Sequence, residues 1–365
     1  MRGLIRLEKR IDFPVWFPFF AVFISLVTGL VFSAIIFALK GVNPLIVLGG
    51  IFSGSFGSLY GLKETLGKAI PLMLIGTGLT LPFMAKFWNI GAEGQLVVGA
   101  AASAGFALFV GQSLPAYILF PLMFLCAFIA GAIWAVIPVV LKNSFGVSEV
   151  ISTLMLNYIA FELVTMLVVG PWRGATQQGY PYSDDLPEAA RLYLFPYTRI
   201  SPLMLFIALI IVVTAWFALY RSRLGYEIRV TGESRDAARY AGIHTSLVLL
   251  FSMAFSGGLA GVAGLGEITA IHHHLAMPSV ISAGYGFTGI IVAWLARRNP
   301  LLVPLTAFFF AGILVGGDAI QISVGLPAST VSVFNGIILL SLLIADFILT
   351  YRLVPVKKTK TEKEK

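Results

Sequence analysis

The chain has 365 residues, of which 58% are hydrophobic and only 12% are charged, and its mean hydropathy is +0.92. A soluble core of this length cannot bury so much apolar surface, so the composition excludes a soluble globular protein and indicates a bilayer protein. The formal net charge of +8 does not indicate nucleic acid, because the basic residues do not cluster with aromatic residues in a soluble module.

Ten apolar blocks follow one another along the chain, and each is close to the ~20 residues that a helix needs to cross a bilayer. We therefore predict an all-α integral membrane protein with about ten transmembrane helices. The predicted spans are residues 15-39, 66-86, 90-110, 115-141, 150-170, 202-220, 246-270, 280-296, 301-319 and 332-351.

The distribution of Lys and Arg predicts the orientation of the spans. With ten spans and the N-terminus inside, 19 of the 25 Lys and Arg residues fall in inside segments, as the positive-inside rule expects. Residues 1-14 then form a cytoplasmic N-terminal segment, 15-351 the transmembrane domain and 352-365 a basic cytoplasmic tail that meets membrane lipids. Both termini are expected in the cytoplasm.

The stretch FWNIGAEGQLVVGA, from Phe87 to Ala100, interrupts the apolar pattern between the second and third spans. Its polar side chains are Asn89, Glu93 and Gln95, and three glycines loosen the backbone around them. Two interpretations remain open. The segment is either a broken or re-entrant path that lines an inner vestibule, or a set of helix-end caps.

The fifth predicted span carries two polar residues, Asn157 and Glu162. A carboxylate inside a bilayer costs about 2.5–3.5 kcal/mol on insertion scales, so such a residue usually faces protein or water. Asn157 and Glu162 either line a path for a hydroxyl-rich solute or hold helices together.

Two further segments lie outside the apolar pattern. Residues 171-200 form a long outer loop that is either a solvated connector or a cap that meets a partner at the outer mouth. The run from His272 to His274 is expected at the outer interface and not at a metal site, because three adjacent residues cannot converge on one ion.

The inner loop, residues 221-245, contains the signals of a short helix of about two turns. Ser234 is a good N-cap, Asp236 places negative charge in the first turn, and Gly242 suits the left-handed residue that ends a helix. Between them, Ala237 and Ala238 favour helix. A rigid element of this kind is expected to press into a partner.

No catalytic pattern accompanies these features. The stretch from Gly61 to Ala69 is not a phosphate loop, because five residues separate its glycines and Ala69 replaces the magnesium-binding hydroxyl. The sequence contains no HExxH pattern and no Ser/His/Asp arrangement. We therefore expect no catalytic residue, no metal and no cofactor in this chain, and if ATP with magnesium drives this protein, another chain must bind it.

Several of these stretches resemble one family. Glu233, the Ala237 and Ala238 pair, and Gly242 followed by Ile243 look like the coupling loop of the permease subunits of ABC importers, although the acid does not directly precede the alanines. The stretch NIGAEGQ, residues 89 to 95, resembles the signature of the simple-sugar and nucleoside subgroup of the branched-chain amino acid and ribose-type permeases. GVSEVISTLMLNYIA and GYGFTGIIVAWLARRNP are similar to two further blocks, with Trp294 and Ala296 departing from the usual Leu and Gly.

The resemblance runs from about residue 65 to 345 and implies the rest of the assembly. It implies a prokaryotic cytoplasmic membrane protein that pairs with a second permease, a copy of itself or a different chain. Two ATPase subunits and an external solute-binding lipoprotein would complete a transporter for a nucleoside or simple sugar. An alternative from the residues alone is an ion-coupled secondary transporter in which Glu162 or Glu267 titrates.

Overall fold

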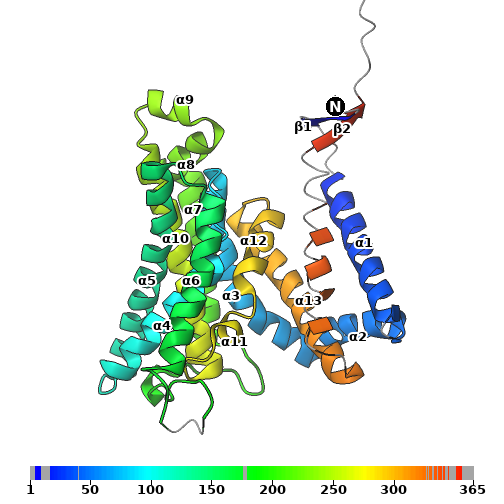
Figure 1. Cartoon of the computed structure of the whole chain (residues 1–365), viewed down its shortest axis with the longest axis vertical. Helices are drawn as coiled ribbons and strands as arrows, with labels where there is room; N and C mark the ends of the chain where they lie inside the picture. Colours follow the sequence, from blue (N-terminus) through cyan, green and yellow to red (C-terminus); the bar gives the residue numbers. More distant parts are fainter. Residues whose placement is uncertain are drawn as a thin grey trace, which may run out of the picture. The chain divides into compact units, whose positions relative to one another are not determined.

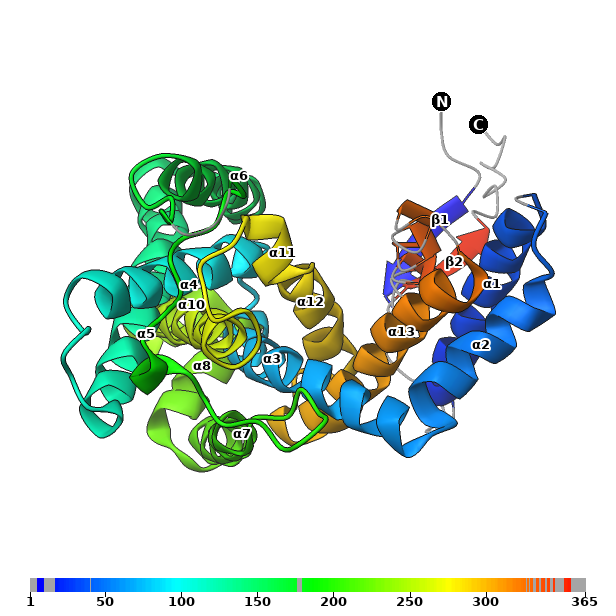
Figure 2. The same cartoon turned by 90° about the horizontal axis from the view of Figure 1, so that it is seen from below.

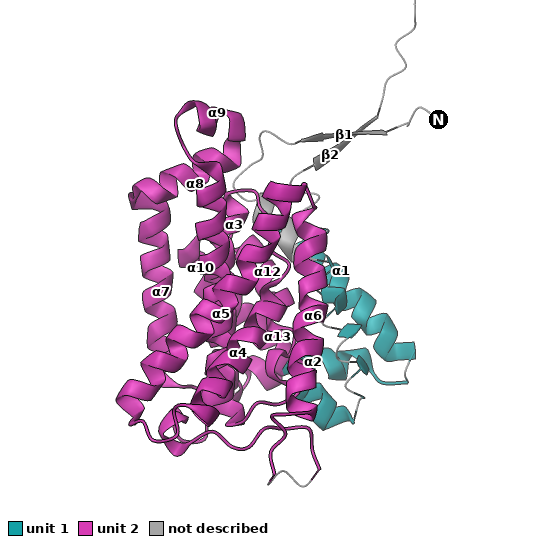
Figure 3. Ribbon diagram, turned by 60° about the vertical axis from the view of Figure 1, so that its left-hand side comes forward, with its two compact units in different colours: residues 1–52, 316–365 teal, residues 53–315 magenta. Residues whose placement is uncertain are grey.

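The structure is a computed structural model. It describes residues 5–9, 17–39, 41–175, 179–325, 327, 329–330, 333–334, 336–338, 340–341, 344 and 351–355. The chain divides into two compact units, one built from residues 1–52 and 316–365 and the other from residues 53–315 (Figure 3).

The first unit contains both ends of the chain. Its elements are β1 (Ile5–Lys9), α1 (Phe17–Leu39), most of α2 (Pro44–Phe56), the end of α13 (Val303–Val324) and β2 (Tyr351–Pro355). β1 and β2 pair antiparallel, with Ile5 opposite Pro355 and Lys9 opposite Tyr351. The sequence did not predict this strand pair. The structure describes only part of the tenth predicted span, 332-351, and most of the basic tail lies outside the described residues.

The second unit is helical (Figure 1). Its elements are α3 (Leu59–Met84), α4 (Ala92–Phe109), α5 (Ala116–Phe145), α6 (Glu149–Val169), η1 (Glu188–Ala190), α7 (Pro202–Arg221), α8 (Arg223–Glu233), α9 (Arg235–Tyr240), α10 (Thr245–Gly266), η2 (Glu267–His272), α11 (Pro278–Ser282), α12 (Tyr285–Leu295), η3 (Pro300–Leu302) and the start of α13. In the described part of the chain, eight segments are long and apolar enough to cross a membrane, and they correspond to the second to ninth predicted spans. The predicted all-α membrane class is confirmed.

Small residues allow the central helices of this unit to approach closely. α10 packs against α3, α4 and α5, as the view along the helices in Figure 2 shows. A Cβ on Gly99 would overlap the backbone of Gly261, and one on Gly131 would overlap the backbone of Gly257. Because lipid offers no hydrophobic drive for helix association, such close contacts are a main source of attraction between spans.

Three boundaries differ from the prediction. Residues 40-65, expected as an outer loop, contain α2 and the start of α3 at Leu59, whose N-cap is Ser58. The search for apolar blocks of membrane-spanning length missed α2. Its 13 residues make only about 20 Å of helix, which is too short to cross a bilayer. The eighth span, expected as one helix over 280-296, is broken into α11 and α12 by Ala283 and Gly284, both with positive φ.

The basic residues of this unit gather at one end. Contacts join Phe87 to Lys142, Trp88 to Trp294 and Gly232 to Met84, so the turns that carry them meet at the end that bears α8 and α9. Nine of the 14 Lys and Arg residues in 53–315 belong to these turns, and the other five belong to the opposite turns. The positive-inside rule associates an end with this excess of Lys and Arg with the cytoplasm.

Candidate functional site

The broken eighth span places a helix N-terminus inside the bundle, and Glu93 occupies it. Oε2 of Glu93 accepts a hydrogen bond of 2.6 Å from the backbone N–H of Gly286, in the first turn of α12. The Ser282 side chain and the N–H groups of Gly284 and Phe287 also bond to this carboxylate. A carboxylate there satisfies N–H groups that have no partner within the helix and complements the positive end of its dipole.

The close approach at this point depends on glycine. A Cβ on Gly286 would overlap the backbone of Glu93, so no other residue fits without a shift of α4 or α12. Gly284 has a φ of 77°, a left-handed conformation that glycine adopts without strain. The glycines that loosen the eighth span in the sequence therefore have a defined role, which is to bring α12 against Glu93.

Asn89 and Gln95 bond to each other. The amide of each donates to the carbonyl oxygen of the other at 3.0 Å, and Asn89 also donates to the Ser256 hydroxyl at 3.1 Å. The Asn89 carbonyl oxygen further accepts from the N–H of Gly91 at 2.9 Å. Ser256 lies eleven residues after Thr245, about 16 Å along α10, so this turn is buried among the helices.

Asn157 of α6 clamps the same turn from the other side. Its side chain donates to the carbonyl oxygen of Ile90 and accepts from the N–H of Gly94, both at 2.9 Å. Glu162 does not share this position, because it lies on the exposed side of α6 while Asn157 is buried. Five residues rotate a helix by about 140°, which explains why the two side chains face apart.

We call the buried set Asn89, Glu93, Gln95 and Asn157 the polar knot. Each member is at most 4% exposed, and each bonds to backbone groups, to another member or to both. A buried polar network is stable when its donors and acceptors are paired, and these contacts are of that kind. The knot fixes the path of residues 89–95 and the start of α12, and its role in a translocation pathway stays a prediction.

The inner loop forms the helix that its capping residues predict. α9 begins after Ser234, whose hydroxyl accepts from the N–H of Ala237 at 3.2 Å. Gly242 has a φ of 75°, and the N–H of Ile243 bonds to the carbonyl oxygen of Ala238 at 2.9 Å, which closes the C-terminus. The local structure is confirmed. The helix α8, which precedes it, was not predicted, because Gly225 and Gly232 weaken its helical signal.

Only one side of α9 is anchored. Ala238 is fully buried and Ile243 is 9% exposed, and both belong to an apolar cluster with Ile228 and Leu249. Tyr240 is 96% exposed, and α9 lies at the tip of its end of the bundle (Figure 1). The remaining exposed candidates are Glu233, Ser234, Asp236, Ala237 and Gly242. We call α9 with these flanking residues the knob.

The knob has little electrostatic attachment to the rest of the unit. Glu233 Oε2 lies 3.9 Å from Lys86 Nζ, and both side chains are more than half exposed. Exposed pairs of this kind contribute about 0–1 kcal/mol. The apolar contacts of Ala238 and Ile243 therefore hold the knob, and its charged side chains remain available at the surface.

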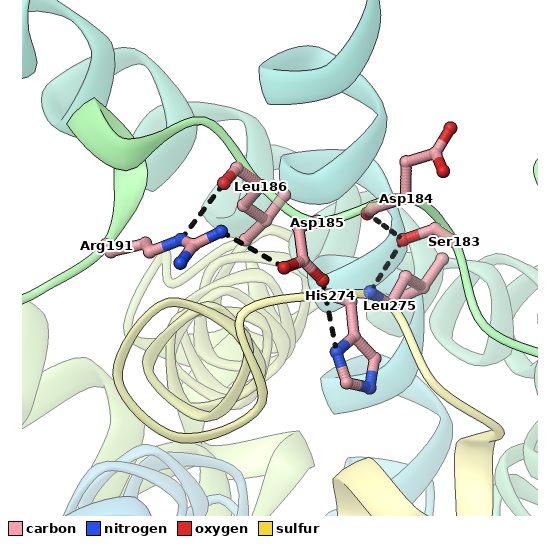
Figure 4. Close-up of polar contacts among 7 residues, drawn as sticks. All are labelled: Ser183, Asp184, Asp185, Leu186, Arg191, His274 and Leu275. Atoms are coloured by element: carbon pink, nitrogen blue, oxygen red, sulfur yellow. Dashed lines mark hydrogen bonds and ion pairs between the residues drawn. The ribbon is translucent and has the colours of Figure 1, made fainter. Parts of the chain in front are cut away.

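At the opposite end, the outer loop is attached to the segment that follows α10 (Figure 4). Ser183 exchanges hydrogen bonds with Leu275, since its N–H donates to the Leu275 carbonyl and its hydroxyl accepts from the Leu275 N–H, both at 2.9 Å. Leu186 donates its N–H to the carbonyl oxygen of His273 at 2.7 Å. The described part of loop 171-200 is thus packed on the bundle, and its contact with a partner stays a prediction.

Asp185 lies between two bases in this attachment. Its carboxylate is 3.2 Å from Nη2 of Arg191 and 3.8 Å from Nδ1 of His274, and the His274 ring stacks on Tyr182 at 4.7 Å. Burial lowers the pKa of His274 from its ordinary value, Asp185 acts in the opposite direction, and His273 lowers it further. His272 faces Glu267 at 4.0 Å, so the two outer histidines have different acidic neighbours.

Sequence reasoning missed an aromatic stack at the α8–α9 end. The ring of Trp294, where the resemblance expects Leu, stacks on Trp88 with centroids 4.9 Å apart, and Arg298 lies 5.8 Å from its centroid. Phe83 packs against both tryptophans. The departure at Trp294 was visible in the sequence, but its partner Trp88 was not, because the two are far apart in the chain.

Comparison with known proteins identifies the family. Residues 61–343 match the family described as branched-chain amino acid transport system / permease component. The chain belongs to this family. It is 35% identical over 358 residues to a glucose ABC transporter permease protein of Haloferax volcanii, an alignment that covers 95% of this chain and 93% of that protein.

Two other relatives have related names. A guanosine ABC transporter permease protein of Bacillus subtilis is 31% identical, with 87% of this chain and 90% of that protein covered. A nucleoside ABC transporter permease protein of Lactococcus lactis is 29% identical, with 87% and 88% covered. The predicted membership of this permease family is confirmed, and the chain is a multi-pass protein of the cytoplasmic membrane.

Proposed function

We propose that this chain is the permease subunit of an ATP-driven importer for a neutral, hydroxyl-bearing solute, either a simple sugar or a nucleoside. The family and its named relatives support the permease role. Those relatives are ABC transporter permeases, which disfavours the ion-coupled alternative. The chain's part is to bind and release the solute while other subunits hydrolyse ATP with magnesium, so it needs no catalytic residue of its own.

The observation that carries the proposal is the knob. It combines a capped helix, an anchored apolar side and an exposed polar side that includes Tyr240. A helix held this rigidly transmits a push to α8 and α10, against which it packs. An ABC ATPase is the partner that such a surface would meet at the end rich in Lys and Arg. An external solute-binding protein would dock at the opposite end.

The polar knot supports a neutral solute. In transporters with broken spans, the N-terminus of a half-helix often binds an anionic group of the substrate. Here the carboxylate of Glu93 occupies the N-terminus of α12. An anionic substrate would have to compete with Glu93 at that place, whereas a neutral solute would not. The glucose and guanosine of the named relatives are both neutral.

Transport in vesicles tests this function. The permease is reconstituted with its genomic ATPase and receptor partners, and uptake of labelled glucose, guanosine and leucine is measured with and without ATP. We expect ATP-dependent uptake of glucose or guanosine and none of leucine. Uptake of leucine alone would contradict the hydroxyl-bearing substrate class, and uptake that persists without ATP would contradict the ATP-driven role.

The same preparation also tests whether the second permease is a copy of this chain or a different chain. The mass of the purified complex distinguishes one kind of permease from two.

A further inference from the structure

Three helices at the periphery of the second unit expose one side, and the exposed side of α6 differs from the other two. α5, α6 and α7 are mostly exposed, whereas α3, α4 and α10 are mostly buried (Figure 2). No charged residue occurs between residues 117 and 140 of α5 or between 203 and 220 of α7, so lipid can cover both helices. α6, in contrast, carries Glu162 on its exposed side.

Glu162 lies well inside its span. It is about 20 Å along α6 from Glu149 and about 10 Å from Val169, at which the helix ends. In the part of the chain that the structure describes, its side chain has no ion pair and no hydrogen bond, and α6 packs against α4, α5 and α11 through its other side. Because an ionisable residue at this depth faces protein or water, the exposed side of α6 is not a lipid-facing surface.

Glu162 shares this side of the helix with Met155, Tyr158 and Ile159, which are all exposed. The four positions follow the spacing of three, four and seven residues that places side chains on one helix face, and we call them the α6 face. An ionised carboxylate only accepts hydrogen bonds, which suits the hydroxyl groups of a neutral solute. The Tyr158 ring adds flat apolar area, and a mostly apolar wall with a few polar groups is usual in small-molecule sites.

A dry contact with another subunit fits the α6 face poorly. Such a contact would remove water from the Glu162 carboxylate, and a buried carboxylate without a partner is costly. Water in a path keeps the carboxylate hydrated until a solute hydroxyl replaces a water molecule. The observations therefore favour an aqueous surface over both lipid and a packed interface.

We propose that the α6 face lines the solute path of the importer and binds the solute there. The Glu162 carboxylate accepts hydrogen bonds from hydroxyl groups of a neutral solute, and the Tyr158 ring packs against the solute. The inference rests on the proposed import of such a solute. It places the contact on the outside of a single subunit, so the opposite wall of the path comes from another chain, which in the proposed assembly is the second permease.

The reactivity of an introduced thiol tests whether water reaches the α6 face. Cys126→Ser removes the single cysteine of the chain, and Ile159→Cys places a thiol ten residues from each end of α6. The complex of permease and ATPase subunits is purified in lipid nanodiscs, and the rate of reaction with a charged methanethiosulfonate is measured with and without ATP. We expect fast reaction in at least one condition, because the thiolate is the reactive form and water stabilises it.

Val213→Cys on α7 is the matched control. Ile159 and Val213 are 53% and 56% exposed, and Val213 lies eleven residues after Pro202 and eight before Arg221. Both thiols are therefore near the middle of a span. Since lipid disfavours the charged thiolate, the thiol at position 213 should react at least about tenfold more slowly than the thiol at position 159.

Added solutes test binding at the same thiol. Glucose, guanosine and choline, an organic cation, are compared, and a solute at ten times its Kd that covers the thiol slows the reaction about tenfold. We expect protection by glucose or guanosine and none by choline. Glu162→Gln should raise the half-protecting concentration about tenfold, because a hydrogen bond to a charged acceptor becomes one to a neutral acceptor.

Further variants separate binding from general effects. Tyr158→Leu should raise the half-protecting concentration as Glu162→Gln does, and both should leave the melting temperature unchanged, because both side chains are exposed. Glu188→Gln, which changes an exposed acid of the outer loop, should leave the concentration unchanged.

The outcomes distinguish this proposal from the proposed function. Fast reaction at position 159 with protection by glucose or guanosine that weakens with Glu162→Gln supports the α6 face as a solute site. Equal rates at positions 159 and 213, no protection, or protection by choline alone overturns it, even if the reconstituted transporter imports solute with ATP. Protection without any ATP-dependent uptake would overturn the importer role and leave the solute site standing.

Discussion

The polar knot and the knob are both rich in polar residues, but these residues are buried and hydrogen-bonded in the knot and exposed in the knob. In the knot, the side chains of Asn89, Glu93 and Gln95 are buried and bonded within the chain. In the knob, Asp236 and Tyr240 are exposed, and only Ala238 and Ile243 are anchored. The comparison teaches that internal bonding of polar groups holds a shape, whereas exposed polar groups on a rigid base are suited to a partner.

The difference predicts two kinds of mutational effect. Changes in the knot should reduce folding and transport together, because buried N–H and C=O groups lose their partners. Changes on the exposed side of the knob should leave folding intact and reduce only the association with a partner.

The largest effect is expected for Glu93→Ala. Removal of the carboxylate leaves N–H groups at the start of α12 without a partner, at a cost of about 3 kcal/mol or more. We expect a lower melting temperature and a smaller monodisperse fraction in detergent, in step with the loss of transport. Glu93→Gln retains an acceptor oxygen and should lose less. A Glu93→Ala protein of normal stability that fails to transport would instead place this carboxylate in the pathway.

Asn157→Ala should have the next largest effect. It breaks the bonds to Ile90 and Gly94 and should cost about 2 kcal/mol, measured by thermal unfolding in detergent. Glu162→Ala, on the exposed side of the same helix, is the control and should change stability by less than about 0.5 kcal/mol. Equal losses for both variants would contradict the difference in placement.

Tyr240→Ala should act on association alone. Truncation of an exposed aromatic side chain at an interface commonly weakens binding about tenfold or more. We expect an unchanged melting temperature and a reduced yield of the ATPase in co-purification. Tyr197→Ala, almost equally exposed at the opposite end, should leave the yield unchanged. A drop in melting temperature for Tyr240→Ala would show that the residue is structural.

The smallest effect concerns pH at the outer loop. Because burial in the folded state lowers the pKa of His274 from 6.5, against the opposite effect of Asp185, the folded state favours the neutral ring. The contact is therefore fully stable above pH 6.5 and loses stability as the pH falls below it. Amide exchange at Ser183 and Leu186 should increase when the pH is lowered from 7.5 to about 5.5, after correction for intrinsic exchange. His274→Gln should remove this dependence, and an unchanged dependence would assign it to another group.

The knob could be predicted from the sequence because its signals are local. Ser234 and Gly242 act within a few residues of themselves, and the structure shows both in the expected conformations. The apolar blocks likewise predict eight of the described spans, because a spanning helix must satisfy its own backbone groups.

The contacts of the knot could not be predicted, because they are not local. Glu93 and Gly286 are separated by 193 positions, and Asn89 and Ser256 by 167. The sequence indicated that residues 87–95 and 284–289 were irregular. It did not indicate that the Glu93 side chain of the first segment would bond to a backbone N–H group of the second. The helix α2 was not predicted for a different reason. An apolar helix of 13 residues is shorter than the length used to recognise a membrane span.

The central claim is that force enters this permease through the knob, and photocrosslinking tests it most directly. A benzophenone amino acid is placed at position 240 in one preparation and at position 197 in another, and the crosslinked products are identified by mass spectrometry in native membranes. The account predicts an ABC ATPase among the products from position 240 and none from position 197. An ATPase product from position 197 alone would contradict it.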